Sequence, residues 1–213
     1  MHRKSLILIG GGGHCKSCID VIESTDEWII SGIIDKEEME GKQILGYPVI
    51  GTDNDLDRLV KEGHYFLITI GQIKSADSRK ILFSRLREKD AKIATVVSSK
   101  AIVSKYASIG PGTIVHHSCI VNAAVNIGAN CIINTAANIE HDTQVGDHTH
   151  VSTCAVLNGN VMIGSECFIG SGTVISNGIH ISDNVIIGAG SVLMKSINVA
   201  GIYAGTPGKI IVR

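Results

Sequence analysis

The chain has 213 residues, 44% of them hydrophobic and 18% charged, so it can bury one or two apolar cores. Its formal net charge is −1 and it has no basic run, which gives no reason to expect binding to nucleic acid. The longest apolar stretch near the start, residues 6–13, is too short for a signal sequence or a membrane span. We therefore expect a cytoplasmic protein with no membrane insertion.

Strands and helices alternate over the first hundred residues. Apolar runs predict strands at 4–9, 29–34, 47–50, 65–70 and 92–97, and helical spacing predicts helices at 14–23, 53–61 and 75–88. This alternation predicts a small parallel sheet with right-handed crossovers, that is, a Rossmann-like domain over residues 1–97. Ligands of such sheets bind beyond the carboxyl ends of the strands, where the glycine loop 10–13, Asp35 and Gly71 lie.

The four glycines at 10–13 match only part of a dinucleotide fingerprint, because Cys15 stands at the third glycine position. Amides at a helix N-terminus beside such a loop can bind a phosphate, and Asp35 could hold a ribose or the edge of a base. We favour a mononucleotide or a nucleotide sugar, since the sheet is too small for both halves of a dinucleotide site. A tight turn with no ligand and a dinucleotide site both stay open.

Sixteen hexapeptides follow without an insertion over residues 101–196, each with Ile, Val or Leu at its third position. The first position of every hexad is small or β-branched. A fixed period of six is typical of a parallel β-helix, in which each hexad supplies a short strand and a turn. We therefore predict a second domain over residues 98–213, a β-helix followed by a short C-terminal tail.

The second positions of the hexads point outward and form three faces if three hexads make one coil. One apolar face comprises Ile102, Ile120, Asn138, Val156, Val174 and Val192. The other comprises Ile114, Ile132, His150, Phe168 and Ile186. Apolar stripes of this extent mark partner surfaces, and two different stripes on one protomer predict a ring, most simply a homotrimer.

Six cysteines raise the question of a metal or redox site. Three of them, Cys119, Cys131 and Cys167, occupy inward positions where a small apolar residue fits. Cys15 and Cys18 form a C-x-x-C pair at the start of a predicted helix, but no second pair accompanies them. We expect neither a redox role nor a metal.

His141 lies between Glu140 and Asp142, close to the polar interruption of an apolar face at Asn138. Either acid could orient the imidazole and raise its basicity, and histidine suits a general base near neutral pH. Gly159 follows one coil later and would lie on the next rung, where its N–H could polarise a carbonyl. The sequence predicts His141 as the general base and the Gly159 amide as the oxyanion donor.

Several motifs carry a resemblance to a known family over essentially the whole chain. They are Ile9 with 10–13 and His14, the segments 32–35, 50–51 and 70–71, Asn134-Thr135, the segment 139–141, the segment 158–161 and the segment 204–207. With these motifs the chain resembles the NeuD/PglD family of bacterial sugar acetyltransferases, within the hexapeptide-repeat acyltransferases. Members often have Gly-His-Gly or Gly-His-Ala in the first loop, whereas Cys15 follows His14 here.

The resemblance implies a left-handed β-helix, a homotrimer and acetyl transfer from acetyl-CoA, with His141 as base and Asp142 as the acid that tunes it. It implies nucleotide-sugar contacts at Gly12, Gly13, His14, Asp35 and Gly71, with Asn134 near the acceptor. It implies thioester contacts at His150 and Gly159, and a CoA arm that runs along Ser171 and Ala189.

We expect direct attack by an amino group of a nucleotide-linked 4-amino sugar in surface glycan biosynthesis, because no Ser or Cys has a neighbouring base. O-acetylation of sialic acid is the alternative, since residues 152–161 resemble the NeuD branch. A non-catalytic trimer that binds a nucleotide sugar also stays open. The sugar, the nucleotide and the choice between Glu140 and Asp142 are not specified by the sequence.

Overall fold

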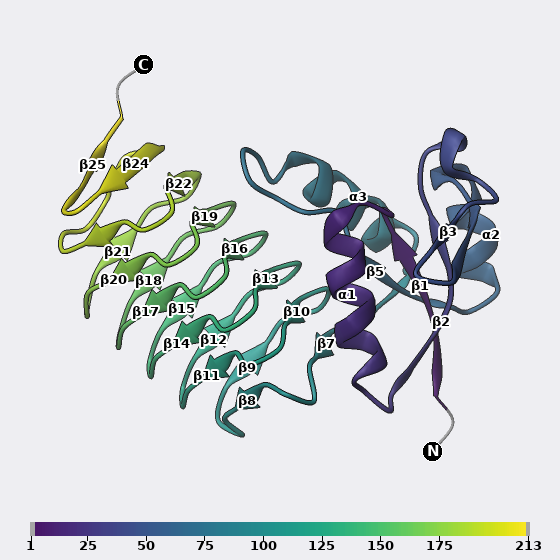
Figure 1. Ribbon diagram of the computed structural model, residues 1–213, viewed down its shortest axis with the longest axis horizontal. Coiled ribbons are helices and arrows are strands. Elements are labelled where there is room, and N and C mark those ends of the chain that lie inside the picture. Colours follow the sequence, from purple (N-terminus) through teal and green to yellow (C-terminus); the bar gives the residue numbers. More distant parts are fainter. Residues whose placement is uncertain (1–2, 212–213) are drawn as a thin grey trace.

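The computed structural model describes residues 3–211, which form an α/β unit and a stack of triangular coils (Figure 1). The helices of the α/β unit are α1 (Gly13–Glu23), α2 (Leu56–Lys61) and α3 (Asp77–Glu88), with 3-10 turns at Glu37–Met39 and Asp53–Asp55. Its strands are β1 (Lys4–Ile9), β2 (Trp28–Ile34), β3 (Gln43–Ile44), β4 (Tyr47–Gly51), β5 (Tyr65–Ile68) and β6 (Lys92–Ile93). The predicted alternation of strands and helices is confirmed.

The sheet of this unit has the order β3-β4-β2-β1-β5-β6, and its pairs are parallel except for β3 with β4. The chain leaves β1 toward β2 on one side and reaches β5 on the other. The strand order therefore reverses at β1, and the crevice at such a switch point is the usual ligand site of an open α/β sheet. The glycine loop occupies this position.

The strand predicted at 92–97 is in fact two strands that belong to different units. β6 pairs with β5 in the α/β sheet, whereas β7 (Val96–Val97) pairs with β10 (Ile114–Val115) of the coils. The coils therefore begin before residue 98. The helix predicted at 53–61 is also interrupted: Thr52 caps a 3-10 turn, and α2 begins only at Leu56.

The coils have three faces, each a parallel sheet of very short strands. The first face is β7, β10, β13 (Ile132–Ile133), β16 (His150–Val151), β19 (Phe168–Ile169) and β22 (Val185–Ile187). The second face is β8 (Ile102–Val103), β11 (Ile120–Val121), β14 (Asn138–Ile139), β17 (Val156–Leu157), β20 (Val174–Ile175) and β23 (Val192–Leu193). The third face is β9 (Ser108–Ile109), β12 (Asn126–Ile127), β15 (Gln144–Val145), β18 (Met162–Ile163) and β21 (His180–Ile181). The hairpin of β24 (Gly201–Gly205) and β25 (Gly208–Ile210) forms the tail and covers the last coil (Figure 1).

The period of six sets both the core and the corners of the coils. The apolar third positions point inward, and from 115 onward they lie in one continuous buried cluster with the inward cysteines. The sixth position of every hexad from 112 to 190 has a left-handed φ. Glycine occupies only four of these corners, and residues such as Asn130 and Asp142 occupy others, since Asn and Asp tolerate this conformation well.

The first face is covered at one end by the α/β unit of the same chain. Helix α1 lies between the sheet and the first coils, and Cys18 and Ile19 pack in one cluster with Ile114 and Ile132, which are fully buried (Figure 1). The expectation that this part of the face meets another protomer is therefore wrong. The apolar second positions at 114 and 132 exist because α1 packs on them.

The second face has no such cover within the described chain. Ile102 is 68% exposed, Ile120 37% and Val174 36%, and Val156 is partly exposed. None of the helices within residues 3–211 combines the length and apolar character that crossing a lipid bilayer requires.

Candidate active site

The loop between β1 and α1 brings backbone amides to the carboxyl end of the sheet. Gly10 has a φ of +98°, and a Cβ there would come within 2.4 Å of the Cγ1 atom of Ile70. A Cβ at Gly12 or Gly13 would meet nothing within 4 Å, so these two residues leave open space over the loop. No side chain caps the first turn of α1. An open, uncapped helix N-terminus of this kind suits a phosphate.

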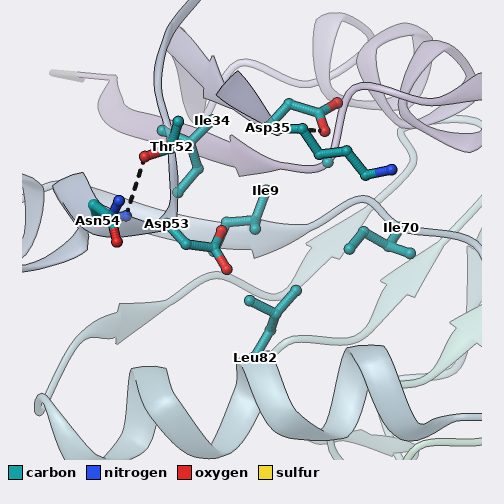
Figure 2. A pocket seen from close by; sticks show the side chains of 10 residues that line it. Ile9, Ile34, Asp35, Thr52, Asp53, Asn54, Ile70 and Leu82 are labelled. Atoms are coloured by element: carbon teal, nitrogen blue, oxygen red, sulfur yellow. Dashed lines mark hydrogen bonds between the residues drawn. The ribbon is translucent and has the colours of Figure 1, made fainter. Parts of the chain in front are cut away.

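A pocket of ≈ 310 Å³ lies beside this loop (Figure 2). It is lined by Ile9, Gly10, Ile34, Asp35, Lys36, Thr52, Asp53, Asn54, Ile70 and Leu82. Isoleucine and leucine side chains supply apolar walls, and carboxylate, amide and ammonium groups supply polar ones (Figure 2). This volume and this mixture are typical of a site for one small flat molecule, such as a nucleoside.

Asp35 holds the glycine loop and also lines the pocket. Its Oδ2 atom accepts the N–H of Gly11 at 2.7 Å, and its Oδ1 atom accepts the N–H of Lys36 at 2.7 Å. Each carboxylate oxygen can accept a second hydrogen bond. The structure therefore gives Asp35 a role in shaping the loop, in addition to the ligand contact that the sequence predicts.

Helix α1 carries His14 from the loop to the first face of the coils. The centroid of the His14 ring lies 5.3 Å from that of His116 and 6.4 Å from that of His150. A Cβ at Gly71 would lie 3.4 Å from the Cβ of His14. Burial lowers the pKa of His14 to about 3 and that of His116 and His150 to about 4, so all three rings are neutral at neutral pH.

The hydrogen bonds of His150 fix which of its nitrogens carries the proton. Its Nδ1 atom lies 2.6 Å from the carbonyl oxygen of Gln72, which can only accept, so Nδ1 is protonated. The Nε2 atom then accepts the Nδ2–H of Asn134 at 3.2 Å. The amide of Asn134 is oriented in turn by the N–H of Thr135, which donates to its Oδ1 atom at 2.8 Å. The Nε2 lone pair of His150 is thus used to orient the Asn134 amide.

His141 lies in the turn after β14, and its two acidic neighbours play different parts. The Nδ1 atom of His141 lies 2.8 Å from the Oδ2 atom of Asp142, at a left-handed corner, and both side chains are exposed. The Glu140 carboxylate instead accepts from Asn122 at 2.8 Å and from Asn138 at 3.0 Å. Asp142 is therefore the acid that orients the imidazole, which decides the choice that the sequence left open.

Gly159 is next to His141 on the following rung. A Cβ at Gly159 would lie 2.7 Å from both the Cε1 and the Nε2 atoms of the His141 ring, so only glycine leaves this space to the imidazole. The Nδ2 atom of Asn177, one further coil along, would lie 3.3 Å from the same Cβ. Within residues 3–211, the Gly159 N–H has no hydrogen-bond acceptor. An amide without an acceptor and the imidazole therefore lie beside each other on adjacent rungs.

The predicted residues gather at two different corners of the prism. Asn134, Ser171 and Ala189 lie in turns between the first and second faces, and we call this the first corner. His141 and Gly159 lie in turns between the second and third faces, and we call this the second corner. One six-residue side of the coil separates them, roughly 15–20 Å at about 3 Å per residue. The structure does not bring all of the predicted residues together within one chain.

Two residues that the sequence analysis did not single out hold the two units together. Gln72 donates from Nε2 to the carbonyl oxygens of His148 and Cys167, at 2.9 and 3.1 Å. Arg79, fully buried, donates to the carbonyl oxygens of Ile68 and Ile70 and to both oxygens of Asn130. Burial lowers the pKa of Arg79 to about 10. Most hydrogen-bond partners of Gln72 and Arg79 are remote in sequence, so no sequence motif indicates that these two residues join the units.

Two segments of the chain match known protein families. Residues 5–86 match the family model "PglD N-terminal domain", and residues 160–195 match "Hexapeptide repeat of succinyl-transferase". None of the curated proteins matches the sequence significantly.

Solved structures match over the whole chain. The perosamine N-acetyltransferase of Caulobacter crescentus, solved with CoA and GDP-perosamine, shares 29% identity at a TM-score of 0.90, with 98% of this chain and 97% of that chain covered. The acetyltransferase domain of PglB from Neisseria gonorrhoeae shares 28% identity at a TM-score of 0.92, with 98% and 100% covered.

The chain thus combines a PglD-type N-terminal domain with hexapeptide repeats, and it is similar over its whole length to solved sugar N-acetyltransferases. The coils of this acyltransferase are therefore a left-handed parallel β-helix, as the family resemblance implied. WeeI from Acinetobacter baumannii, at 21% identity and a TM-score of 0.79 over 98% of this chain and 100% of that chain, shares the fold. The α/β unit, the coils and the turn of His141 therefore belong to an acyltransferase.

Proposed function

We propose that this acyltransferase moves an acetyl group from acetyl-CoA to an amino group of a nucleotide-linked amino sugar, in the biosynthesis of a surface glycan. The observation that carries the proposal is the nucleoside-sized pocket at the switch point of the sheet, which the glycine loop connects to His14 and the coils. The Caulobacter relative bound to CoA and GDP-perosamine, and the Neisseria relative solved with acetyl coenzyme A, support the same pair of substrates.

The pocket and the loop amides of the α/β unit support the following placement of the nucleotide sugar. The nucleoside occupies the pocket of Figure 2, with Asp35 at its edge. The phosphates lie over the open amides of Gly12 and Gly13, at the positive end of the α1 dipole. The sugar then extends past Gly71 and His14 toward Asn134.

We assign the chemistry to the second corner. His141 removes a proton from the sugar amine through Nε2 as the amine nitrogen attacks the thioester carbonyl, and Asp142 stabilises the imidazolium through Nδ1. The Gly159 N–H donates to the oxyanion of the tetrahedral intermediate. When the C–S bond breaks, the imidazolium of His141 returns this proton to the CoA thiolate, which leaves as the free thiol, and the amide remains on the sugar.

The acetyl-CoA site, in this proposal, follows the turns of the first corner. The Oγ atoms of Ser152 and Ser171 lie 2.9 Å apart, and the turn of Ala189 stacks on that of Ser171 through the N–H of Gly190, which donates to Ser171 O at 2.8 Å. The exposed turns of Ser171 and Ala189 form a track along which a pantetheine arm extends past Ser152 to His150. With its Nε2 lone pair already facing Asn134, neutral His150 orients Asn134 as the donor toward the thioester.

Because the two corners are one side of the prism apart, the complete site needs two protomers. A homotrimer supplies them: the exposed apolar second face of each protomer packs against its neighbour, so that the second corner of one chain meets the first corner of the next. The sequence predicts two apolar subunit faces, but α1 covers one end of the first face, so the second face is the one left for the subunit contact.

The experiment that tests the proposed function measures acetylated product and free CoA by mass spectrometry, with acetyl-CoA and a panel of acceptors. The panel contains 4-amino sugars linked to UDP, GDP or dTDP, together with free and nucleotide-linked sialic acid. We expect acetylation of one nucleotide-linked amino sugar, at the nitrogen. Acetylation of a sialic acid hydroxyl would replace this acceptor by the alternative one. Tight binding of a nucleotide sugar with no product from any acceptor would contradict an enzymatic role.

A further inference from the structure

We propose that His14, Cys18 and His116 form a binding site for one divalent transition metal of the Zn²⁺ class, between α1 and the first coils. One ligand atom from each of the three residues lies within 4.8 Å of those of the other two. Two of the residues come from one helix and the third from a coil about a hundred positions later. The fold itself therefore assembles the cluster, and the sequence pattern of Cys15 and Cys18 did not indicate it.

One ring nitrogen of each histidine in the cluster is buried and lacks a partner. The Nε2 atoms of His14 and His116 are both inaccessible to solvent, and neither has a hydrogen-bond partner among the described residues. Their rings are stacked at a tilt of 38° rather than hydrogen-bonded to each other. A buried polar atom without a partner costs about 1–3 kcal/mol, so two of them side by side point to a missing bonded group.

The donor set selects the kind of ion. Two imidazole nitrogens and one thiolate are the ligands of a borderline-soft ion such as Zn²⁺, whereas Mg²⁺ and Ca²⁺ take oxygen atoms. His14 and Cys18 lie four residues apart on α1 and so project from the same side of the helix. Tetrahedral coordination requires donors about 3.3–3.7 Å apart, so the three side chains would close by about 1 Å on binding.

Charge and protonation are consistent with this assignment. The Cys18 thiol is fully buried and protonated in the absence of an ion, and on binding its proton passes to solvent while a metal–sulfur bond forms. The thiolate reduces the charge of the loaded site from +2 to +1. The lower charge favours binding, because the positive Arg79 guanidinium lies near the site and repels a cation there. Oxygen atoms of Ile68, Ile70 and Asn130 already surround that guanidinium.

The bound ion would clamp the α/β unit to the β-helix, because its ligands come from both. It would fix the first turn of α1, where the glycine loop ends. This inference does not rest on the proposed acetyl transfer, since its test reads metal binding and not turnover.

The test is titration of the metal-free protein with Co²⁺, followed by absorption, and of parallel samples with Zn²⁺, followed by melting temperature. We expect a thiolate-to-cobalt charge-transfer band that saturates at one Co²⁺ per chain, and a melting temperature that rises with the Zn²⁺ concentration. The variants Cys18→Ser and His116→Gln should each weaken binding by at least about 100-fold, since even the loss of an outer partner costs up to that factor.

Two matched controls separate this site from adventitious binding. Cys15→Ser alters the other buried cysteine of α1, and Cys154→Ser removes the exposed thiol of the coils. Both should keep the cobalt band and the Zn²⁺-dependent stabilisation. The proposal is overturned if the parent protein shows no thiolate band, if the band survives in Cys18→Ser, or if it disappears in Cys154→Ser. The first of these outcomes is independent of whether any variant folds.

Discussion

At the scale of single residues, the two acids beside His141 make different predictions. Asp142 contacts the imidazole, so Asp142→Asn should lower kcat about 10- to 100-fold through loss of orientation and of charge stabilisation. Glu140 contacts only Asn122 and Asn138, so Glu140→Gln should leave kcat nearly unchanged. Initial rates of acetylated product under saturating substrates measure both. A larger loss in Glu140→Gln than in Asp142→Asn would contradict the assignment.

The imidazole itself is tested by His141→Ala. The loss of a general base typically costs 10²- to 10⁴-fold, and we expect kcat to fall by about this factor. The side chain is 62% exposed, so the variant should keep its fold and its affinity for both substrates. Calorimetric titration with nucleotide sugar and with CoA checks the second expectation. Turnover near that of the parent would remove His141 from the mechanism.

Gly159 is the residue at which a single methyl group should separate activity from stability. In Gly159→Ala the new Cβ would lie 2.7 Å from the imidazole of His141, and the exposed ring can rotate away at little cost to folding. We expect kcat to fall at least about tenfold while the melting temperature changes by no more than a few degrees, because the new methyl group displaces the base by about 1 Å. An unchanged kcat would show that the observed position of His141 is not the reactive one.

At the scale of elements, the β1–α1 loop and its carboxylate decide nucleotide binding. Asp35→Ala removes the acceptor of the Gly11 and Lys36 amides and one polar wall of the pocket. We expect the KM for the nucleotide sugar to rise about ten- to a hundredfold, since hydrogen bonds to a charged group are worth about 1.5–3 kcal/mol. The KM for acetyl-CoA should change little. Equal affinity of parent and variant for the bare nucleotide would limit Asp35 to a role in the fold.

Helix α3 is joined to the coils by Arg79. Arg79→Met keeps an unbranched side chain but leaves the oxygens of Ile68, Ile70 and Asn130 without their donor. Each buried unpaired group costs about 1–3 kcal/mol, so we expect the melting temperature to fall by about 6–12 °C or more. Arg85→Met on the same helix is the control. It removes only a partly exposed salt bridge with Asp53 and should change the melting temperature by less than about 3 °C. Similar effects of the two changes would contradict the assignment.

The elements also show what a sequence can and cannot specify. The hexads predict their strands and inward residues one by one, because period six is a local property that each coil repeats. The split between β6 and β7 was missed, since an apolar run does not tell which of two sheets it joins. The oxygen acceptors of Arg79 and the neighbours of His14 depend on how the two units dock. No spacing along the chain encodes that contact.

At the scale of the whole molecule, a charge introduced on each of the three faces of the prism should have a different effect. Ile132 of the first face is buried beneath α1, so Ile132→Glu should unfold the chain rather than dissociate an assembly. Val156→Glu on the second face should instead yield folded monomers by sedimentation, because it places a charge in each subunit contact of the proposed trimer. Met162→Glu, on the exposed third face, is the control and should keep the parent's assembly. Identical sedimentation of all three variants and the parent would contradict the trimer.

A composite site makes a sharper prediction for mixed assemblies. His141→Ala chains keep an intact nucleotide pocket, and Asp35→Ala chains keep an intact base. At a nucleotide-sugar concentration well below the raised KM of Asp35→Ala, neither chain alone therefore makes an effective site. If the base of one protomer serves the sugar bound to its neighbour, every mixed trimer regains one complete site. Random 1:1 mixing makes about three quarters of the trimers mixed, so about a quarter of the parent activity should return in the unfractionated mixture and about a third in isolated mixed trimers. Co-expression of differently tagged chains, followed by tandem purification, isolates these trimers for assay. Activity no higher than that of the single variants would place the whole site within one chain, and the separation of the two corners would then have to close by a movement inside the protomer.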